Sequence, residues 1–456
     1  MRSSSDATKT VVPSEPRAGV IRDRPRNFPV LQLSSPALIV IVALVFRMVV
    51  LFSLAHGRVV RLSPDYVNEG TCIASSIASG HGFASPLRGA PTGPTAWVCP
   101  IFPYLEAGTF RIWGAFTPRS LLALQILNCI FASLTVIPIY AAAKRTFCLP
   151  VGAWAAWVWA FLPFAWWTPL QEIWDASLAA LLLTLLIYTT LVVRGRTRGV
   201  DWIAYGVLWA VGALVNATLL SVFPFLLGWA ARDSARRRFC LRAVSISLAT
   251  CALALLPWTI RNHAVFGKWI PLRSNFGLEL WLGNNATTAD VNSFSGHPFI
   301  NSSEAAEFHR LGEGPYVAMK QGEALAYMRA HPAHTADAIL HRVVLFWTAV
   351  TDRPGARWST VPSYLKVLGI LNGLMICLTA ITVAVILARA SLAALPYLLV
   401  LLVFPVPYYL THSLVRYRFP VEPVITIMAV LGFTVAASSI RTVASRKNVR
   451  PPQQLT

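Results

Sequence analysis

Hydrophobic and polar residues occur in long blocks along this chain rather than in short alternation. Ten mostly apolar stretches each approach the length of a membrane span: residues 36–55, 121–143, 151–168, 173–193, 202–216, 218–231, 243–259, 363–388, 391–410 and 419–440. Roughly 20 apolar residues in a helix cross a hydrocarbon core of about 30 Å. The pattern therefore predicts an all-α polytopic membrane protein with about ten transmembrane helices. The two short stretches that meet at Asn216 are expected to be half-length helices buried among their neighbours.

Two long polar segments, residues 56–120 and 260–362, separate these stretches. The short connections carry most of the basic residues: Lys144, Arg145, Arg194, Arg196, Arg198, Arg232, Arg236, Arg237, Arg238, Arg441, Arg446 and Lys447. Because basic short loops stay on the cytoplasmic side, both chain ends are expected there and both long polar segments on the outer side. Long loops in a compact membrane protein are usually functional, so we expect the site among them.

Composition supports this interpretation. Hydrophobic residues make up 55% of the 456 residues and charged residues only 13%, against roughly 25% charged in soluble domains. The net charge of +20 would suggest nucleic acid in a soluble protein, but here the basic residues flank apolar stretches, so membrane lipids are the expected partner and nucleic acid is not. Residues 1–35 and 441–456 are predicted to be cytoplasmic tails, the first basic and disordered, around a transmembrane domain at 36–440.

The first polar segment contains the string SPDYVNEGTCIASSIASGHGF. It predicts a helix from Tyr66 to Ser79 that Asp65 would cap and that Gly80 or Gly82 would end. At this stage Asp65 is either that cap or a catalytic base. Cys72 and Cys99 share the segment, and a disulfide between them is left open. The second segment mixes Gly/Asn turns with helical stretches, which favours a small folded outer cap.

Candidate chemistry lies at the outer ends of the predicted spans. Moving a sugar from a phosphate to a hydroxyl requires a base for the acceptor and positive charge for the departing phosphate. The candidate acids are Asp65, Glu69, Glu172 and Asp175; the candidate cations are Arg261, Lys268, Arg273, Arg416 and Arg418, with His412 close by. Arg416 and Arg418 are equally consistent with snorkelling to lipid headgroups, and Asp175 with a simple ion pair.

Four strings in order along the chain resemble a known family. They are SPDYVNEGTCIASSIASGHGF, GPTAWVCPIFPYL, LPWTIRNHAVFGKWIPLRSNFGLELWLGNN and RYRFPVEP. Together they resemble the bacterial members of glycosyltransferase family 39, the GT-C group related to protein O-mannosyltransferases and aminoarabinose lipid A transferases. The resemblance implies a GT-C bundle, a polyprenyl- or dolichyl-phosphate sugar as donor, and an acid in the first outer loop as base. Asp65 matches that position, so transfer by direct, inverting displacement is expected.

Several points stay open. Family members often carry adjacent acids in the first loop, whereas Tyr66 follows Asp65 here and the next acid is Glu69, so the number of catalytic acids is not fixed. A divalent metal is neither indicated nor excluded. The donor sugar is a hexose or a pentose, and the acceptor a glycan, a lipid or a protein of the cell envelope. The protein is expected in the plasma (inner) membrane with its site on the outer, periplasmic side. Alternative functions are a lipid-linked glycan polymerase or ligase, and a secondary transporter.

Overall fold

The structure is a computed structural model that describes residues 35–56, 66–232, 237–286, 294–348 and 363–447. Helices are the regular elements of these residues, and an isolated bridge between Ala84 and Pro94 is the one β-type pairing among them. The prediction of an all-α membrane protein is confirmed.

Seven helical segments of the described residues are long and apolar enough to cross a membrane. They are α1 (Pro36–His56), α4 (Pro118–Leu134) with α5 (Val136–Thr146), α8 (Ala176–Val193), α11 (Arg237–Phe266), α16 (Ser363–Ala388), α17 (Leu395–Val403) with α18 (Val406–Leu410), and η6 (Val415–Val421) with α19 (Glu422–Lys447). The pair α6 (Leu149–Phe161) and α7 (Pro163–Gln171), bent by 43°, makes an eighth if it is a single span. Two apolar segments are shorter, α9 (Gly199–Val215) and η2 (Ala217–Val222) with α10 (Phe223–Ala231), so the expected count of about ten is not established.

Three breaks in this bundle lie between consecutive helices. One separates α7 from α8 at residues 172–175, the second lies at Asn216 between α9 and η2, and the third covers residues 411–414 between α18 and η6. The break at Asn216 is the one that the sequence predicted. Non-helical backbone at membrane depth is tolerated only where protein buries it or where it lines a cavity. These breaks therefore indicate where to look for a site.

Arg47 binds the backbone carbonyl groups at the bend between α6 and α7. This arginine lies inside α1 and is fully buried. Its Nη2 donates to the carbonyl oxygens of Trp159 (3.2 Å) and Ala165 (3.0 Å), which flank the bend between α6 and α7. Backbone carbonyls freed by a bend need partners in an apolar medium, and Arg47 supplies them. The charged residue within the first span is thus structural.

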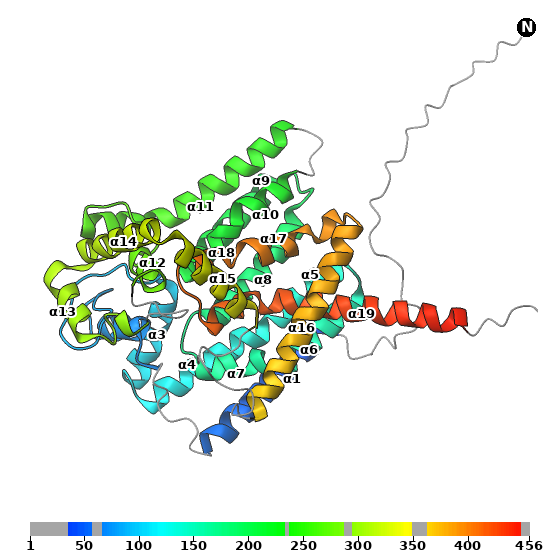
Figure 1. Cartoon of the computed structure of the whole chain (residues 1–456), viewed down its shortest axis with the longest axis horizontal. Helices are drawn as coiled ribbons and strands as arrows, with labels where there is room; N and C mark the ends of the chain where they lie inside the picture. Colours follow the sequence, from blue (N-terminus) through cyan, green and yellow to red (C-terminus); the bar gives the residue numbers. More distant parts are fainter. Residues whose placement is uncertain (1–34, 57–65, 233–236, 287–293, 349–362, 448–456) are drawn as a thin grey trace, which may run out of the picture.

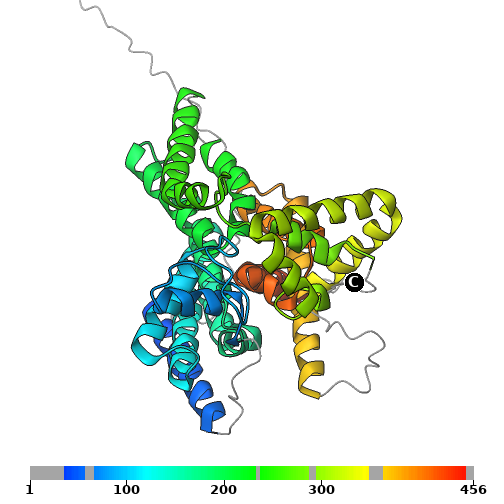
Figure 2. The ribbon, with the colours of Figure 1, turned by 90° about the vertical axis from the view of Figure 1, so that its left-hand side faces the viewer.

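The two long polar segments, which the sequence predicts to lie on the outer side and which we therefore call the outer segments, pack together as one unit, the outer unit. It lies at the left of Figure 1 and faces the viewer in Figure 2. The first contributes α2 (Glu69–Ala78) and α3 (Ile101–Trp113); the second contributes α12 (Phe276–Gly283), α13 (Ser302–Leu311), α14 (Glu313–Ala330) and α15 (Pro332–Thr348). They share a buried core in which Ile73 and Trp97 of the first meet Phe308 of the second. The Glu313 carboxylate at the start of α14 accepts from Ala96 N (2.9 Å), which ties the segments further.

Arg342 of α15 joins this outer unit to the membrane helices. Its guanidinium is buried, donates to the carbonyl of Tyr409 (2.8 Å) in α18 and also contacts the carbonyl of Gly283 in α12. A side chain at Gly283 would overlap the Thr411 carbonyl, because a Cβ there would lie 1.6 Å from its oxygen. The outer unit therefore packs closely against the third break.

The start of α2 corrects one sequence prediction. The helix begins at Glu69, not Tyr66, and its cap is Asn68: the Asn68 Oδ1 accepts from Thr71 N (3.0 Å) and the Thr71 Oγ1 accepts from Asn68 N (2.9 Å). This reciprocal pair satisfies the first turn, so a capping role for Asp65 in α2 is wrong. Asp65 itself lies outside the described residues. The helix ends as predicted, with Ser79 followed by Gly80 at φ +86°.

The assignment of Asn68 as the N-terminal cap of α2 gives a prediction about stability. Asn68→Ala removes the side-chain acceptor at the start of α2 and is expected to cost about 1 kcal/mol, seen as a lower midpoint of thermal unfolding. Asp65→Asn, measured in parallel, is expected to leave that midpoint unchanged. A midpoint lowered by Asp65→Asn but not by Asn68→Ala would return the capping role to Asp65.

Candidate functional site

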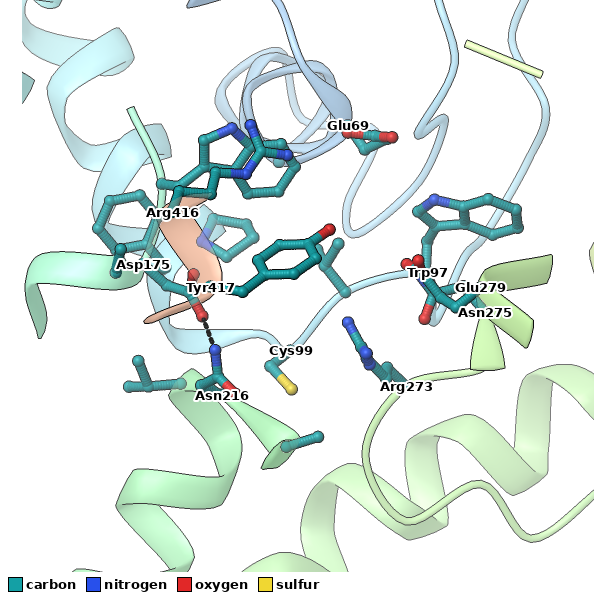
Figure 3. A pocket seen from close by; sticks show the side chains of 18 of the residues that line it. Glu69, Trp97, Cys99, Asp175, Asn216, Arg273, Asn275, Glu279, Arg416 and Tyr417 are labelled. Carbon is teal, nitrogen blue, oxygen red and sulfur yellow. Dashed lines mark hydrogen bonds between the residues drawn. The ribbon is translucent and has the colours of Figure 1, made fainter. Parts of the chain in front are cut away.

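A cavity of about 110 Å³ lies where the three breaks meet the outer unit (Figure 3). Its wall includes Asp175, Asn216 and Thr411 from the breaks themselves. The first outer segment adds residues of α2, of the 97–99 stretch and of α3, and the second adds Arg273, Asn275, Glu279 and His297. Segments that are far apart in sequence thus converge on one polar space at the ends of apolar helices.

Five of the candidate residues line this cavity: Glu69, Asp175, Arg273, His412 and Arg416. Glu172 lies at its edge, where its Oε2 is 3.4 Å from the Nη1 of Arg416. The other three described candidates are elsewhere, and Asp65 lies outside the described residues.

Arg261 does not reach the cavity. It lies within α11, which continues to Phe266 and is longer than the predicted span. Its Nη2 donates to the Phe83 carbonyl (2.8 Å), and its guanidinium carbon lies 5.0 Å from the ring centroid of Trp258. Arg261 therefore holds the first outer segment against the bundle.

Arg418 is also occupied elsewhere. It is fully buried, and its guanidinium binds Glu422 (2.5 Å), the Asn372 Oδ1 (2.6 Å) and the Trp347 carbonyl (2.7 Å). These contacts join α15, α16 and α19. Of the candidate cations, Arg261 and Arg418 therefore do not share the cavity with Arg416. Lys268 is exposed in the loop after α11 and likewise does not line the cavity.

Arg273 is a cation that does line the cavity, unlike Arg261, Arg418 and Lys268. Its guanidinium points into the cavity between Cys99, Tyr417 and Glu279 (Figure 3). Within the part of the chain that the structure describes, no hydrogen bond or ion pair engages it. Burial would lower the pKa of Arg273, but Glu279, Cys99, Tyr408 and Tyr417 together outweigh burial and the net shift is upward. The cavity thus holds a permanent positive charge that is available to an anionic ligand.

Arg416 supplies a second, partly neutralised positive charge. Glu172 lies 3.4 Å from its Nη1, and the ring of Trp174 lies under the guanidinium at 4.6 Å from the centroid. A guanidinium held between a carboxylate and an aromatic face keeps a fixed orientation. Arg416 can therefore present N–H donors to the cavity without a large loss of side-chain freedom.

Two histidines connect the acids of the cavity. His297 Nε2 lies 3.3 Å from Glu69, and His412 Nδ1 lies 3.1 Å from Glu279. Burial would raise the pKa of Glu279, but His412, Arg273 and His297 outweigh burial and hold it at about 2. Burial lowers the pKa of His297 despite the neighbouring Glu69. Glu279 is thus a fixed anion that contacts His412 and acts on Arg273 through its charge.

Asp175 combines burial with a single strong hydrogen bond. Asn216 Nδ2 donates to its Oδ2 at 2.9 Å, joining two of the breaks. Burial raises the pKa of Asp175 to about 6, although Asn216, Arg273 and Arg416 all favour its charged form. Its charge state therefore changes close to neutral pH.

This titration predicts a pH dependence of ligand binding. Asp175 is neutral below about pH 6 and negative above it, and a sugar phosphodiester keeps one negative charge over the whole range. Affinity for a phosphodiester ligand should therefore fall, by up to roughly tenfold, between pH 5 and pH 7. In Asp175→Asn that fall should be much smaller, any remainder coming from His297. An equally steep fall in Asp175→Asn would show that Asp175 is not the titrating group.

Several cavity residues were not predicted from the sequence: Trp97, Glu106, Glu279 and His297. One signal was available for Glu106, because it is the one charged residue of the run PIFPYLEAGTF. An acid alone in an apolar helix has to meet a cavity or a partner. The same signal was available for Glu279, which is the one charged residue of the apolar run FGLELWLG, whereas His297 lies in a loop and gave none.

Metal ligands and cysteines add little to this site. No group of three or more metal-type side chains gathers in the described part of the chain. Cys72 and Cys99 are both free thiols, so the disulfide considered from the sequence is not formed. Cys99 lines the cavity, and burial raises its pKa to about 12, which keeps the thiol neutral.

Known proteins resemble this chain in sequence and in fold. Residues 96–260 match the family model of dolichyl-phosphate-mannose-protein mannosyltransferases. The apo oligosaccharyltransferase of Archaeoglobus fulgidus is similar with a TM-score of 0.55 at 14% identity, over 91% of this chain and 52% of that one. The archaeal oligosaccharyltransferase AglB from the same organism, in complex with an inhibitory peptide and a dolichol-phosphate, gives a TM-score of 0.53 at 13% identity, over 92% and 52%. No curated protein sequence matches the chain significantly.

These similarities confirm the resemblance that the four motifs indicated. The chain has the same fold as these solved oligosaccharyltransferases, a fold of the GT-C type that the resemblance predicted. It spans about half the length of the solved structures that it matches.

Proposed function

We propose that this protein is a membrane glycosyltransferase that moves a sugar from a polyprenyl-phosphate donor to an acceptor hydroxyl. The observation that carries this proposal is the Arg273 guanidinium, unengaged by described residues, in a cavity that also holds carboxylic acids. The site is proposed to open to the outer face of the plasma (inner) membrane, as the basic short loops indicate.

Arg273 and Arg416 are the proposed ligands of the donor phosphate. Charge-assisted hydrogen bonds from guanidinium groups to phosphate are strong, and a site with little water strengthens them further. As the bond from the sugar C1 to the phosphate oxygen breaks, the electron pair stays on that oxygen. Both guanidinium groups stabilise the charge that develops there.

Asp65 is the proposed base. It would take the proton from the acceptor hydroxyl while the hydroxyl oxygen bonds to C1 from the face opposite the phosphate, which inverts C1. This assignment is supported by the family resemblance and by the loss of the capping alternative. It is supported further by Glu69 and Gly70, a few residues along the chain, which line the cavity. Asp175 and Glu69 are the other candidate acids that line the cavity, beside Glu106 and Glu279.

The similar proteins support a lipid-linked donor. The matching family is described as using dolichyl-phosphate-mannose, and one solved relative carries a dolichol-phosphate. Mannose is therefore the first sugar to test, beside other hexoses and pentoses. The solved relatives are oligosaccharyltransferases, so a lipid-linked glycan is the second donor class to include.

The experiment is a thermal-unfolding titration of the purified protein with polyprenyl-phosphate mannose, glucose, galactose and arabinose. A donor that binds only the folded state raises the unfolding midpoint as its concentration passes Kd. Polyprenol without phosphate is the matched control and should give a much smaller shift. Equal shifts from polyprenol and from every phosphate-linked sugar would contradict recognition of the phosphate.

A further inference from the structure

The carboxyl group of Glu106 lies in the cavity wall without a partner. Phe102, Pro103 and Glu106 occupy one face of α3, and all three line the cavity. Glu106 is 1% exposed, and both carboxyl oxygens lack a hydrogen-bond partner among the described residues. Buried polar groups are rarely left unsatisfied, because burial without a partner costs free energy.

Gly70 lets the first turn of α2 approach this carboxyl closely. A Cβ at Gly70 would lie 3.2 Å from the Glu106 Oε2 and 3.2 Å from the Asn68 Oδ1. Gly70 is the second residue of α2 and lines the cavity, so the Glu106 carboxyl lies where α2 and α3 meet at the cavity wall. The unsatisfied carboxyl is the feature that a bound ligand would account for.

We propose that Glu106 is a specificity-determining residue whose carboxyl group binds two neighbouring hydroxyl groups of the sugar on the donor lipid. This inference rests on the proposed function, because it names the part of the donor that the site recognises. Glu106 lines the same cavity as Arg273 and Arg416, so a donor whose phosphate meets the arginines can bring its sugar to α3.

The charge state of Glu106 fits this role. Burial raises its pKa well above the usual range, and the neighbouring Asp175 adds to the effect. A protonated carboxyl has one donor and one acceptor, whereas a carboxylate has acceptors only. Two adjacent hydroxyl groups can accept one bond and donate the other. A neutral acid is a poor ligand for a cation, which makes a sugar diol the better match.

Two substitutions separate hydrogen bonding from charge. Glu106→Gln keeps one donor and one acceptor and should leave the KM for polyprenyl-phosphate mannose within about threefold of wild type. Glu106→Leu removes both and should raise that KM about 10- to 100-fold. Thr109→Ala, on the same helix and outside the cavity wall, is the control and should behave as wild type.

Donors with single deoxy positions identify the hydroxyl groups. Wild type should discriminate against polyprenyl-phosphate mannose that lacks either of two adjacent hydroxyls, and Glu106→Leu should lose that discrimination. The unfolding midpoint of ligand-free Glu106→Leu should not fall, since the change removes an unsatisfied buried acid. This readout separates lost recognition from lost folding.

Two results would overturn the inference while the proposed function stands. The first is an unchanged KM and unchanged discrimination in Glu106→Leu. The second is a Gln variant as impaired as the Leu variant, which would require an ionised carboxylate. If the wild-type protein binds none of the phosphate-linked sugars, the proposed function and this inference both fall.

Discussion

Asp65→Asn is expected to reduce sugar transfer by about 10²–10⁴-fold, the usual contribution of a general base. The amide cannot take the proton of the acceptor hydroxyl, so attack on C1 would have to proceed without a base. Folding should be unaffected because Asn68, not Asp65, caps α2. Donor binding should also persist, since the proposed phosphate ligands are Arg273 and Arg416.

The measurement is transfer of radiolabel from a polyprenyl-phosphate sugar into lipid, glycan or protein of host membranes, with the unfolding midpoint recorded for each variant. Glu69→Gln and Asp175→Asn are the matched controls, because each also converts one acid near the site into its amide. Near-normal transfer by Asp65→Asn, together with an inactive Asp175→Asn or Glu69→Gln, would move the base to one of those residues.

Arg273→Gln is expected to lower transfer by about 10²–10³-fold, comparable to the loss of one preorganised donor at a developing oxyanion. Part of the loss should appear as weaker donor binding, because the guanidinium also meets the phosphate of the bound donor. Arg273→Lys keeps the charge but not the two-pronged geometry, and should fall between Arg273→Gln and wild type.

Lys268→Gln is the control for this prediction. It removes one positive charge from the same loop, five residues earlier, at an exposed position outside the cavity. Transfer and the donor-induced rise in unfolding midpoint should stay near wild type in Lys268→Gln. Equal losses in Arg273→Gln and Lys268→Gln would point to the general field of the loop rather than to a phosphate ligand.

The bundle was predictable because its signal is local. Apolar stretches long enough to span a bilayer, and basic residues in the connections between them, can be recognised in the sequence without knowing any tertiary contact. The break at Asn216 could be predicted for the same reason, because it is the boundary between two short apolar runs. The number of spans could not be predicted, since several segments are bent or short.

The site was only partly predictable, because its residues converge from distant segments. Glu69, Asp175, His412 and Arg416 were identified from their places at the ends of apolar stretches, and they line the cavity. The same reasoning could not tell Arg261, which binds backbone carbonyls, from Arg273, which faces the cavity. That difference depends on the direction of each side chain, which follows from how the outer unit packs against the membrane helices.

The prediction of where α2 begins was wrong for another physical reason. Asp65 and Asn68 are both residue types that cap helices well, and the string alone does not decide between them. The reciprocal bonds between Asn68 and Thr71 place the cap three residues later. Competing caps of similar strength are resolved only by the contacts that the first turn makes.

The most direct measurement places the purified protein in liposomes with acceptor-containing membrane extract and radiolabelled polyprenyl-phosphate mannose, glucose, galactose or arabinose. Release of polyprenyl phosphate and incorporation of the sugar are followed together. Wild type should release polyprenyl phosphate from at least one donor in step with incorporation, and Arg273→Gln should do so about 10²–10³-fold more slowly. Label that stays on every donor at the rate seen in protein-free liposomes would contradict a polyprenyl-phosphate-dependent glycosyltransferase.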